Sequence, residues 1–432
     1  ERCSKSLFNY ISKAQYPQRL KFGIVQQVNT EEDTIKDDCI KKYCELIQQQ
    51  YPCKNTEQMK SILFSKRLAR GPAHSHAYDE SLMENEDFCL LSDSHIDVIQ
   101  NWDTELMNMW GMINNEYAVL STTLPSLEVL GKKINNRWEV PHLCHYSWDD
   151  NGLAITGPPA IVIDLEGPLL ASAWSDSFSF SKCHAQKKTL NDPNILRLDS
   201  PVTNVLKYAR LWTRGYDVYT PHRSIIAHSI ESSATDWKQY GMSPVVKTRE
   251  LVTSIERVKT ILGMPGGKKD LQDIIEIEKY GLGTKRTLDQ FIQFIGVDFR
   301  NGELVDNRCK NLNWIPFQPD KDPECEFKDV WGLAPEPQTA YLPIIPSYTP
   351  NIQNQQKGIN QRKSLPWPFN FMDRTIELAI KELSYHSNRD EAIQMLKVIL
   401  LIIPIGVGLL ALATWSIISA GDEFPPPRKD SF

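Results

Sequence analysis

The sequence predicts an α/β protein built on a doubly wound sheet, and two observations support this fold class. Apolar runs of strand length alternate with longer segments in which apolar residues recur at helical spacing. One of these runs, residues 87–92, ends in the tripeptide Asp93-Ser94-His95. Because open α/β sheets bind ligands at the carboxyl ends of their strands, this tripeptide marks the first candidate site.

The first half of the chain gives the alternating order of elements. In the segment 34–50, apolar or aromatic residues recur at every fourth position from Ile35 to Ile47, which is typical of a helix lying on a strand. A second helix is expected to end near Gly71-Pro72, since proline disfavours the α conformation in the residue before it. The expected elements are a strand at 21–27, helices at 34–50 and 57–69, a strand at 87–92, a helix at 96–110 and a strand at 116–121.

The second half of the chain predicts further helices with one apolar face each, and these faces are assigned to the core. A helix over 202–213 is expected to end through a left-handed cap at Gly215, and Thr287 is expected to cap the helix 287–295. The other elements expected here are a strand at 160–164, a strand at 223–228 that ends on His228, and a helix at 246–262.

The end of the chain differs in composition from the rest. Residues 331–369 are rich in Pro, Gln and Asn and predict a linker, and residues 370–397 predict a juxtamembrane helix. Residues 398–421 form a run of 24 without charge, long enough to cross a hydrocarbon core of about 30 Å. We expect a folded domain at 1–330, a single C-terminal transmembrane helix at 398–421 and a short tail at 422–432. A buried soluble helix is the alternative for the apolar run.

Composition restricts the partners but not the compartment. The net charge of −6 leaves no basic surface of the kind that binds nucleic acid, so no nucleic-acid partner is expected. Nine cysteines occur without a CxxC pair or zinc spacing, and a chain of 432 residues can bury a core without disulfides. The sequence holds no Asn-x-Ser/Thr sequon, which favours a chain that is not presented for N-glycosylation.

The tripeptide 93–95 has the chemistry of a metal site. In an extended strand, side chains at i and i+2 leave the same face, so Asp93 and His95 would point together. One carboxylate oxygen and one imidazole nitrogen suit a divalent ion such as manganese that also carries substrate phosphates. The alternative is that these residues cap a helix or form hydrogen bonds at the surface.

Four blocks of sequence together resemble the polypeptide N-acetylglucosaminyltransferases that attach α-linked GlcNAc to serine, threonine or hydroxyproline. The best-known branch of that family modifies a hydroxyproline on the adaptor subunit of a cullin-type ubiquitin ligase. The resemblance covers residues 20–316 and extends to the pieces Tyr280-Gly-Leu-Gly and Arg286-Thr-Leu. The four blocks are Gly23-Ile-Val-Gln-Gln27, Ala69-Arg-Gly-Pro72, Asp93-Ser-His95 with Trp102-Asp103, and Ala209-Arg-Leu-Trp-Thr-Arg-Gly-Tyr-Asp217 leading to Tyr219, Pro221 and His228.

The resemblance implies a GT-A type fold, with a Rossmann-like sheet that binds a nucleotide sugar, and a retaining transfer of GlcNAc from UDP-GlcNAc to a protein hydroxyl. It implies that Asp93, His95 and His228 hold the divalent metal, expected to be manganese, which neutralises the charge that develops on the leaving diphosphate. Val25 and Gln26 would lie near the uracil and ribose of the donor.

Further site residues follow from the same resemblance. Arg70 would reach the donor, with a solvated surface arginine as the alternative. Trp102 would form a wall near the sugar or the acceptor, or else belong to the core. Arg214, on the donor side, and Asp217, as a catalytic residue beside Asp93, would lie in the sugar- or acceptor-side loop, although Asp217 also suits a turn.

Two departures from the family pattern leave a second hypothesis open. Family members carry Gly-Glu-Glu where this chain has Val202-Thr203-Asn204, and Ala-Arg where it has Ser75-His76. The chain is therefore expected to be either an active transferase or a binding protein that keeps the fold without catalysis. With a removed signal peptide it would be a type I protein facing the Golgi or ER lumen, and without one a tail-anchored protein facing the cytosol.

Overall fold

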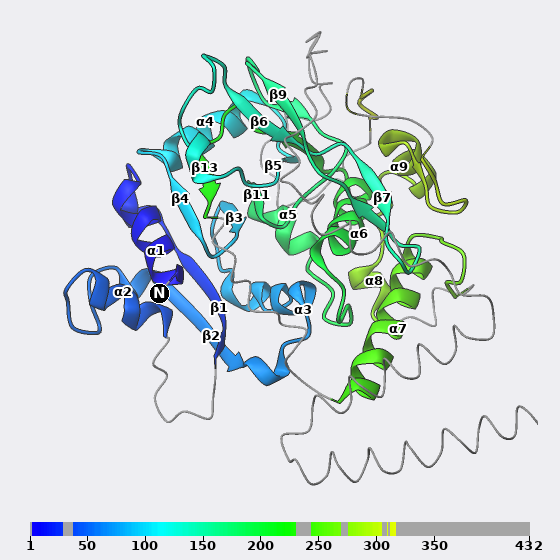
Figure 1. Cartoon of the computed structure of the whole chain (residues 1–432), viewed down its shortest axis with the longest axis horizontal. Coiled ribbons are helices and arrows are strands. Elements are labelled where there is room, and N and C mark those ends of the chain that lie inside the picture. The colour runs from blue at the N-terminus through cyan, green and yellow to red at the C-terminus, as the bar shows by residue number, and fades with distance from the viewer. Residues whose placement is uncertain are drawn as a thin grey trace, which may run out of the picture. The chain divides into compact units, whose positions relative to one another are not determined.

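The computed structural model describes residues 2–28, 38–229, 243–268, 275–304, 309 and 312–316 of the chain (Figure 1). The chain divides into a unit Glu1–Tyr348 and a unit Thr349–Phe432, and the described residues all belong to the first. The predicted linker, juxtamembrane helix, membrane span and tail, residues 331–432, lie outside the described residues. Within the described part, no helix has the length and hydropathy needed to cross a bilayer.

The described elements alternate between helices and strands up to residue 121, apart from two successive strands in 88–98, whereas the strands in 118–182 follow one another without an α-helix and the helices in 244–295 without a strand. The helices are α1 Arg2–Lys13, α2 Cys39–Leu46, α3 Pro72–His76, α4 Trp102–Met112, α5 Cys183–Lys188, α6 Ser200–Thr213, α7 Pro244–Ile261, α8 Ile277–Tyr280 and α9 Leu288–Ile295. The strands are β1 Phe22–Val28, β2 Met59–Ser65, β3 Phe88–Ser92, β4 Ile96–Val98, β5 Ala118–Ser121, β6 Glu139–His142, β7 Tyr146–Trp148, β8 Ala154–Thr156, β9 Ala160–Ile163, β10 Leu169–Leu170, β11 Phe178–Lys182, β12 Asp217–Thr220, β13 Ile226–His228, β14 Val297–Asp298 and β15 Glu303–Leu304.

The central sheet is mixed rather than doubly wound and parallel throughout. Its five strands lie in the order β10-β12-β5-β11-β3, and only β12 and β5 run parallel, while β11 is antiparallel to both of its neighbours. β3, within the predicted strand 87–92, is the edge strand and is half-buried along its length. The turn after β3, which holds Asp93, therefore lies at the open edge of this sheet.

Two predicted helices are corrected by the structure. The segment 57–69 contains β2, which pairs in parallel with β1 from Phe22↔Met59 onward, and this non-local pairing outweighs the local helical preference of the segment. The segment 96–110 holds the short strand β4 followed by α4, because Asn101 adopts a left-handed conformation at φ 59° and separates the two.

The larger core surrounds α6, which is buried over nearly its whole length. Its Trp212 packs on Phe291 and Phe294 of α9, with ring centroids 5.6 and 5.3 Å apart. The predicted caps are confirmed at both helices: Gly215 follows α6 with φ 93°, and Thr287 forms a capping box at the start of α9.

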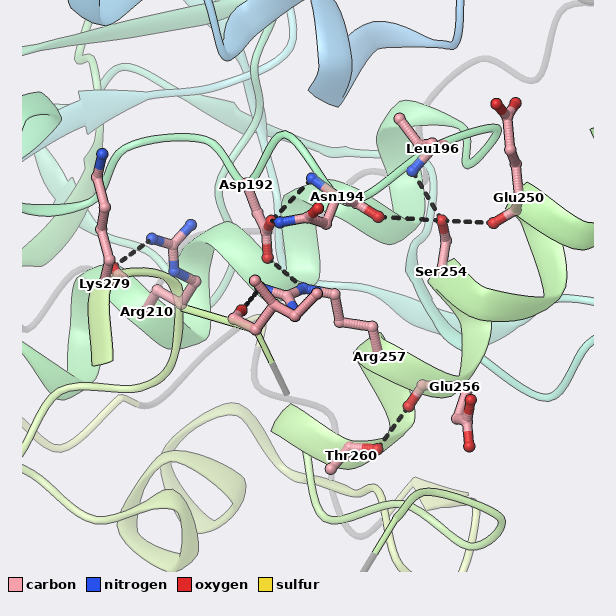
Figure 2. Close-up of polar contacts among 11 residues, drawn as sticks. Asp192, Asn194, Leu196, Arg210, Glu250, Ser254, Glu256, Arg257, Thr260 and Lys279 are labelled. Atoms are coloured by element: carbon pink, nitrogen blue, oxygen red, sulfur yellow. Dashed lines mark hydrogen bonds and ion pairs between the residues drawn. The ribbon is translucent and has the colours of Figure 1, made fainter. Parts of the chain in front are cut away.

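Helix α7 is attached to this core by buried polar groups as well as by apolar contacts (Figure 2). Arg257 Nε forms an ion pair with Asp192 Oδ2 at 2.6 Å, and both side chains are buried. One turn earlier, Ser254 Oγ accepts the backbone N–H of Leu196 at 2.7 Å (Figure 2). These contacts fix the loop before α6 against α7.

Four disulfides join eight of the nine cysteines, and Cys325 lies outside the described residues. This corrects the sequence interpretation, in which size alone made a disulfide framework unnecessary. Disulfides of this kind form and persist in oxidising compartments. The pairs are Cys3–Cys39, Cys44–Cys53, Cys89–Cys183 and Cys144–Cys309.

Candidate functional site

A cleft of about 1330 Å³ lies between β1 and β3, and it is the candidate site. β1 contributes residues 22–27, including Val25 and Gln26, and β3 contributes residues 88–92 together with Asp93. Gly23 allows the turn that follows α3 to come close to β1, since a Cβ on this glycine would lie 2.8 Å from Cβ of Leu82. The predicted nucleotide residues and the predicted metal ligand Asp93 thus line one cleft.

Asp93 lies directly after β3 with half of its side chain exposed to the cleft. Its backbone N–H donates to the carbonyl oxygen of Ser177 at 3.2 Å, which fixes the turn against the central sheet. Packing around the carboxyl raises the pKa of Asp93 above its usual range, while the positive charge of a protonated His228 opposes that rise. Asp93 Oδ2 lies 3.7 Å from His228 Nε2.

The two histidines are held on neighbouring backbone segments. β13 pairs with β4 so that His228 lies opposite Ile96, and the N–H of Ser229 donates to the carbonyl oxygen of His95 at 2.9 Å. The imidazole rings of His95 and His228 have centroids 5.6 Å apart. His95 Nε2 is also 3.2 Å from Nη1 of Arg2 in α1.

These positions suit a metal ion held by Asp93 and His228. His95 can join them only after it loses its contact with Arg2. Ligand atoms about 2.0–2.2 Å from one ion can be separated by up to about 4 Å, which accommodates the Asp93–His228 distance. A metal at Nε2 of His95 would have to displace the Arg2 guanidinium. The three side chains are less tightly grouped than Cys144, His145 and Cys309, whose ligand atoms lie within 4.8 Å of one another in the described part of the chain. That second group is not a metal site, because its two sulfur atoms form a disulfide.

Gln26 has a structural contact in addition to its place on the cleft wall. Its Oε1 accepts the backbone N–H of Cys39 at 3.1 Å, so β1 helps to fix the first turn of α2. The next residue, Gln27, donates through Nε2 to Ser75 Oγ at 2.8 Å. One wall of the cleft is therefore fixed to both α2 and α3.

Trp102 and Asp217, two of the predicted catalytic residues, are both buried, and the burial of Asp217 argues against its predicted role. Trp102 is 5% exposed, and its indole N–H donates to the carbonyl oxygen of Tyr10 at 2.9 Å. Asp217 is 1% exposed and forms an ion pair with Arg286 at 2.9 Å. Its other oxygen accepts the Trp314 indole N–H at 2.8 Å. Trp102 is itself among the residues that line the cleft, whereas Asp217 is absent from the described cleft lining.

The two predicted donor-side arginines also bind protein groups. Arg70 Nε pairs with Glu250 Oε1 at 3.0 Å, which links the segment before α3 to α7. Arg214 Nη1 donates to the carbonyl oxygen of Gly281 at 2.8 Å and thereby joins the end of α6 to α8. Neither arginine is among the described residues that line the cleft, and neither are His95 and His228. The contacts with Glu250 and Gly281 are what argue against the assignment of the two arginines to the donor.

The structure adds polar groups that sequence reasoning missed or placed only loosely. His76 lines the cleft and lies 3.0 Å from Asp79. Burial lowers its pKa, but the charge and hydrogen bond of Asp79 together with the charge of Asp176 oppose this, so the net shift of the pKa is upward. Asp176 Oδ1 accepts from Asn204 Nδ2 at 3.3 Å, so a carboxylate approaches one position where the resembled family carries glutamate. No local pattern marks Asp176, because this contact joins distant segments.

Comparison with known proteins places most of the domain in one family. Residues 31–301 match the family model described as Glycosyltransferase (GlcNAc). No curated protein matches the chain. Among solved structures, the crystal structure of GalNAc-T7 with UDP, GalNAc and Mn2+ is similar at 13% sequence identity and a TM-score of 0.42. The match covers 67% of this chain and 53% of that one, so the chain spans about half the length of that protein.

Proposed function

We propose that this chain, which belongs to the Glycosyltransferase (GlcNAc) family, transfers GlcNAc from UDP-GlcNAc to a hydroxyl group of a protein in a metal-dependent, retaining reaction. The observation that supports this most directly is the cleft that brings Val25 and Gln26 of β1 to the same lining as Asp93. The 3.7 Å approach of His228 to Asp93 adds a second metal ligand. We also propose that the fold is of GT-A type.

The residues in and beside the cleft have separable roles in this proposal, and His228 lies beside it, 3.7 Å from Asp93. β1 forms the wall for the nucleotide, while Asp93 and His228 would hold the divalent ion. When bound, that ion supplies a positive charge that stabilises the leaving diphosphate. His76, with its raised pKa, is a second source of positive charge in the cleft, in place of the arginine of the resembled family.

The test is donor turnover by the full chain with radiolabelled UDP-GlcNAc, with and without manganese. We expect metal-dependent hydrolysis of the donor and transfer to acceptor proteins, both lost in Asp93→Ala and in His228→Ala. Asp150→Asn, at an exposed position outside the cleft lining, is the matched control and should keep full turnover. Turnover that persists without metal or in both alanine variants would contradict the proposal.

A second candidate function is a nucleotide-binding protein of the same fold without transferase activity. It is favoured by Thr203 and Asn204, neutral residues where the resembled family carries two glutamates. UDP binding that needs manganese, without donor turnover under any condition, would favour this alternative. Loss of turnover on replacing Asp176 by Asn, with UDP binding kept, would favour the enzyme.

The disulfides support a location in an oxidising compartment, and we propose that the domain faces the secretory lumen. Membrane attachment through residues 398–421 would then make the chain a type I protein. Protease protection in sealed microsomes tests both points: the domain should be digested only after detergent is added. Digestion without detergent would favour the cytosol-facing arrangement.

A further inference from the structure

Strand β4 has one edge paired with β13, and its other edge is covered by side chains of α1. Ile96 donates its backbone N–H to Ser6 Oγ at 2.9 Å and accepts at its carbonyl oxygen from Asn9 Nδ2 at 3.1 Å. Ser6 and Asn9 are three residues apart and so lie on one face of the helix. The helix thus satisfies both backbone groups that an unpaired strand edge would expose at Ile96.

The contacts of α1 continue along the turn that holds Asp93 and His95. Ser6 Oγ donates to the carbonyl oxygen of Ser94 at 2.8 Å, so one hydroxyl is bonded on both sides of His95. The hydroxyl of Tyr10 donates to Ser92 Oγ at 2.8 Å, at the last residue of β3. Tyr10 is itself buried. The helix therefore bonds to the residues that flank each predicted ligand.

Helix α1 is also fixed covalently, through a residue one turn before Ser6. Cys3 forms a disulfide with Cys39 at the start of α2, and the N–H of Cys39 donates to Gln26 of β1. Leu7 packs in the same apolar cluster as Ile24 of β1. Residues 2–13 precede the segment 31–301 that matches the family, so these contacts are additional to the matched domain.

We propose that α1 is a positioning clamp that holds the backbone of the turn carrying Asp93 and His95, with Ser6 and Tyr10 as its positioning residues; the Arg2 contact of the same helix with His95 Nε2 is broken when a metal binds there. The part of this inference that concerns ligand binding rests on the proposed function, in which the turn is the metal site. The clamp itself concerns only contacts within the chain. It predicts that loosening α1 at Ser6 weakens metal binding even where the chain stays folded.

The experiment measures two quantities on the full chain carrying Ser6→Ala: hydrogen exchange at the Ile96 amide without ligand, and the Kd for manganese in the presence of UDP. We expect at least tenfold faster exchange, because the acceptor of that amide is removed. The Kd should rise about tenfold, since several hydrogen bonds to the turn depend on one hydroxyl. Tyr10→Phe, which removes only the bond to Ser92, should raise the Kd by a smaller factor.

Two control variants separate positioning from stability. Ser12→Ala makes the same chemical change at an exposed position of α1 and should change neither quantity. Val258→Ala loosens the larger core away from α1 and the cleft lining, and should lower Tm while leaving the Kd at low temperature unchanged. Unaltered exchange at Ile96, or equal effects of Val258→Ala and Ser6→Ala on the Kd, would overturn the clamp. Failure of the unaltered chain to bind manganese and UDP would instead overturn the proposed function, and exchange would still test the clamp.

Discussion

Replacing Asp217 by Asn distinguishes between two roles for this residue: the catalytic role predicted from the sequence and the structural role seen in the fold. The sequence predicts a catalytic residue, whereas the structure buries Asp217 against Arg286, with side-chain exposures of 1% and 0%. Arg286 also lies over the ring of Trp212 at 4.5 Å and donates to the carbonyl oxygen of Ile315 at 2.9 Å. Asp217→Asn would leave this guanidinium buried without its counter-charge.

The expected loss of stability is large. Removing one partner of a buried ion pair costs about 3–5 kcal/mol, because the remaining charge cannot be hydrated. For a domain of this size, each kcal/mol shifts Tm by about 2 °C, so Tm should fall by roughly 6–10 °C. Asp217→Leu combined with Arg286→Met should recover part of the loss. The recovery is incomplete because Ile315 loses its donor.

The assay combines thermal unfolding with donor turnover at low temperature, where the variant is still folded. We expect Asp217→Asn to keep most of its turnover per folded molecule despite the lower Tm. Asp150→Asn is again the exposed control and should leave Tm unchanged. If Asp217→Asn lost turnover while its Tm stayed unaltered, the structural role of Asp217 would be refuted and the residue would again be a catalytic candidate.

Three further predictions concern acidity, disulfides and the metal site. Burial lowers the pKa of His142 to about 4. The stability that this neutral histidine gives above pH 6.5 should therefore be lost as the pH falls toward 4, by up to about 3 kcal/mol. His142→Gln should flatten the profile of Tm against pH, and an unchanged slope would contradict this. The double variant Cys89→Ala, Cys183→Ala lacks a disulfide that joins residues 94 positions apart, and its free energy of unfolding, measured in urea, should be lower by about 4.5 kcal/mol. Equal stability of the variant and the unaltered chain would argue against the bond. Arg2→Ala should tighten manganese binding about fivefold, since the metal no longer competes for Nε2 of His95, and weaker binding in calorimetry would count against that competition.

The elements predicted correctly are those whose local pattern agrees with their packing. α9 has a strong N-cap and an apolar face, and α6 ends at a glycine that can adopt positive φ, so both could be placed from sequence. β2 was missed because its hydrogen bonds go to β1, which local periodicity does not report. α1 was not predicted at all, and its packing on β4 gives it a role that its own sequence does not indicate.

The sequence resemblance named some residues that the structure brings close together and others whose charges are bound by protein groups. Asp93 and His228 are far apart in the chain, and the structure brings them within 3.7 Å. The resemblance also pointed to Arg70 and Asp217, but their partners Glu250 and Arg286 come from distant segments and occupy their charges. A charged residue can be assigned to a ligand only when its protein partners are known.

The two walls of the cleft belong to different sheets, and a third element joins them. β1 belongs to a two-stranded sheet and β3 to the edge of the central sheet, so no backbone ladder fixes the distance between them. Tyr10 of α1 bridges this gap, because its ring lies 6.3 Å from Phe22 of β1 and 4.9 Å from Trp102 of α4, while its hydroxyl reaches Ser92 of β3. The separation of the proposed nucleotide wall from the proposed metal turn is therefore set by a helix outside the matched family segment. Trp102 therefore acts on the cleft in two ways: it supports the ring that spaces the two walls, and it lines the cleft itself.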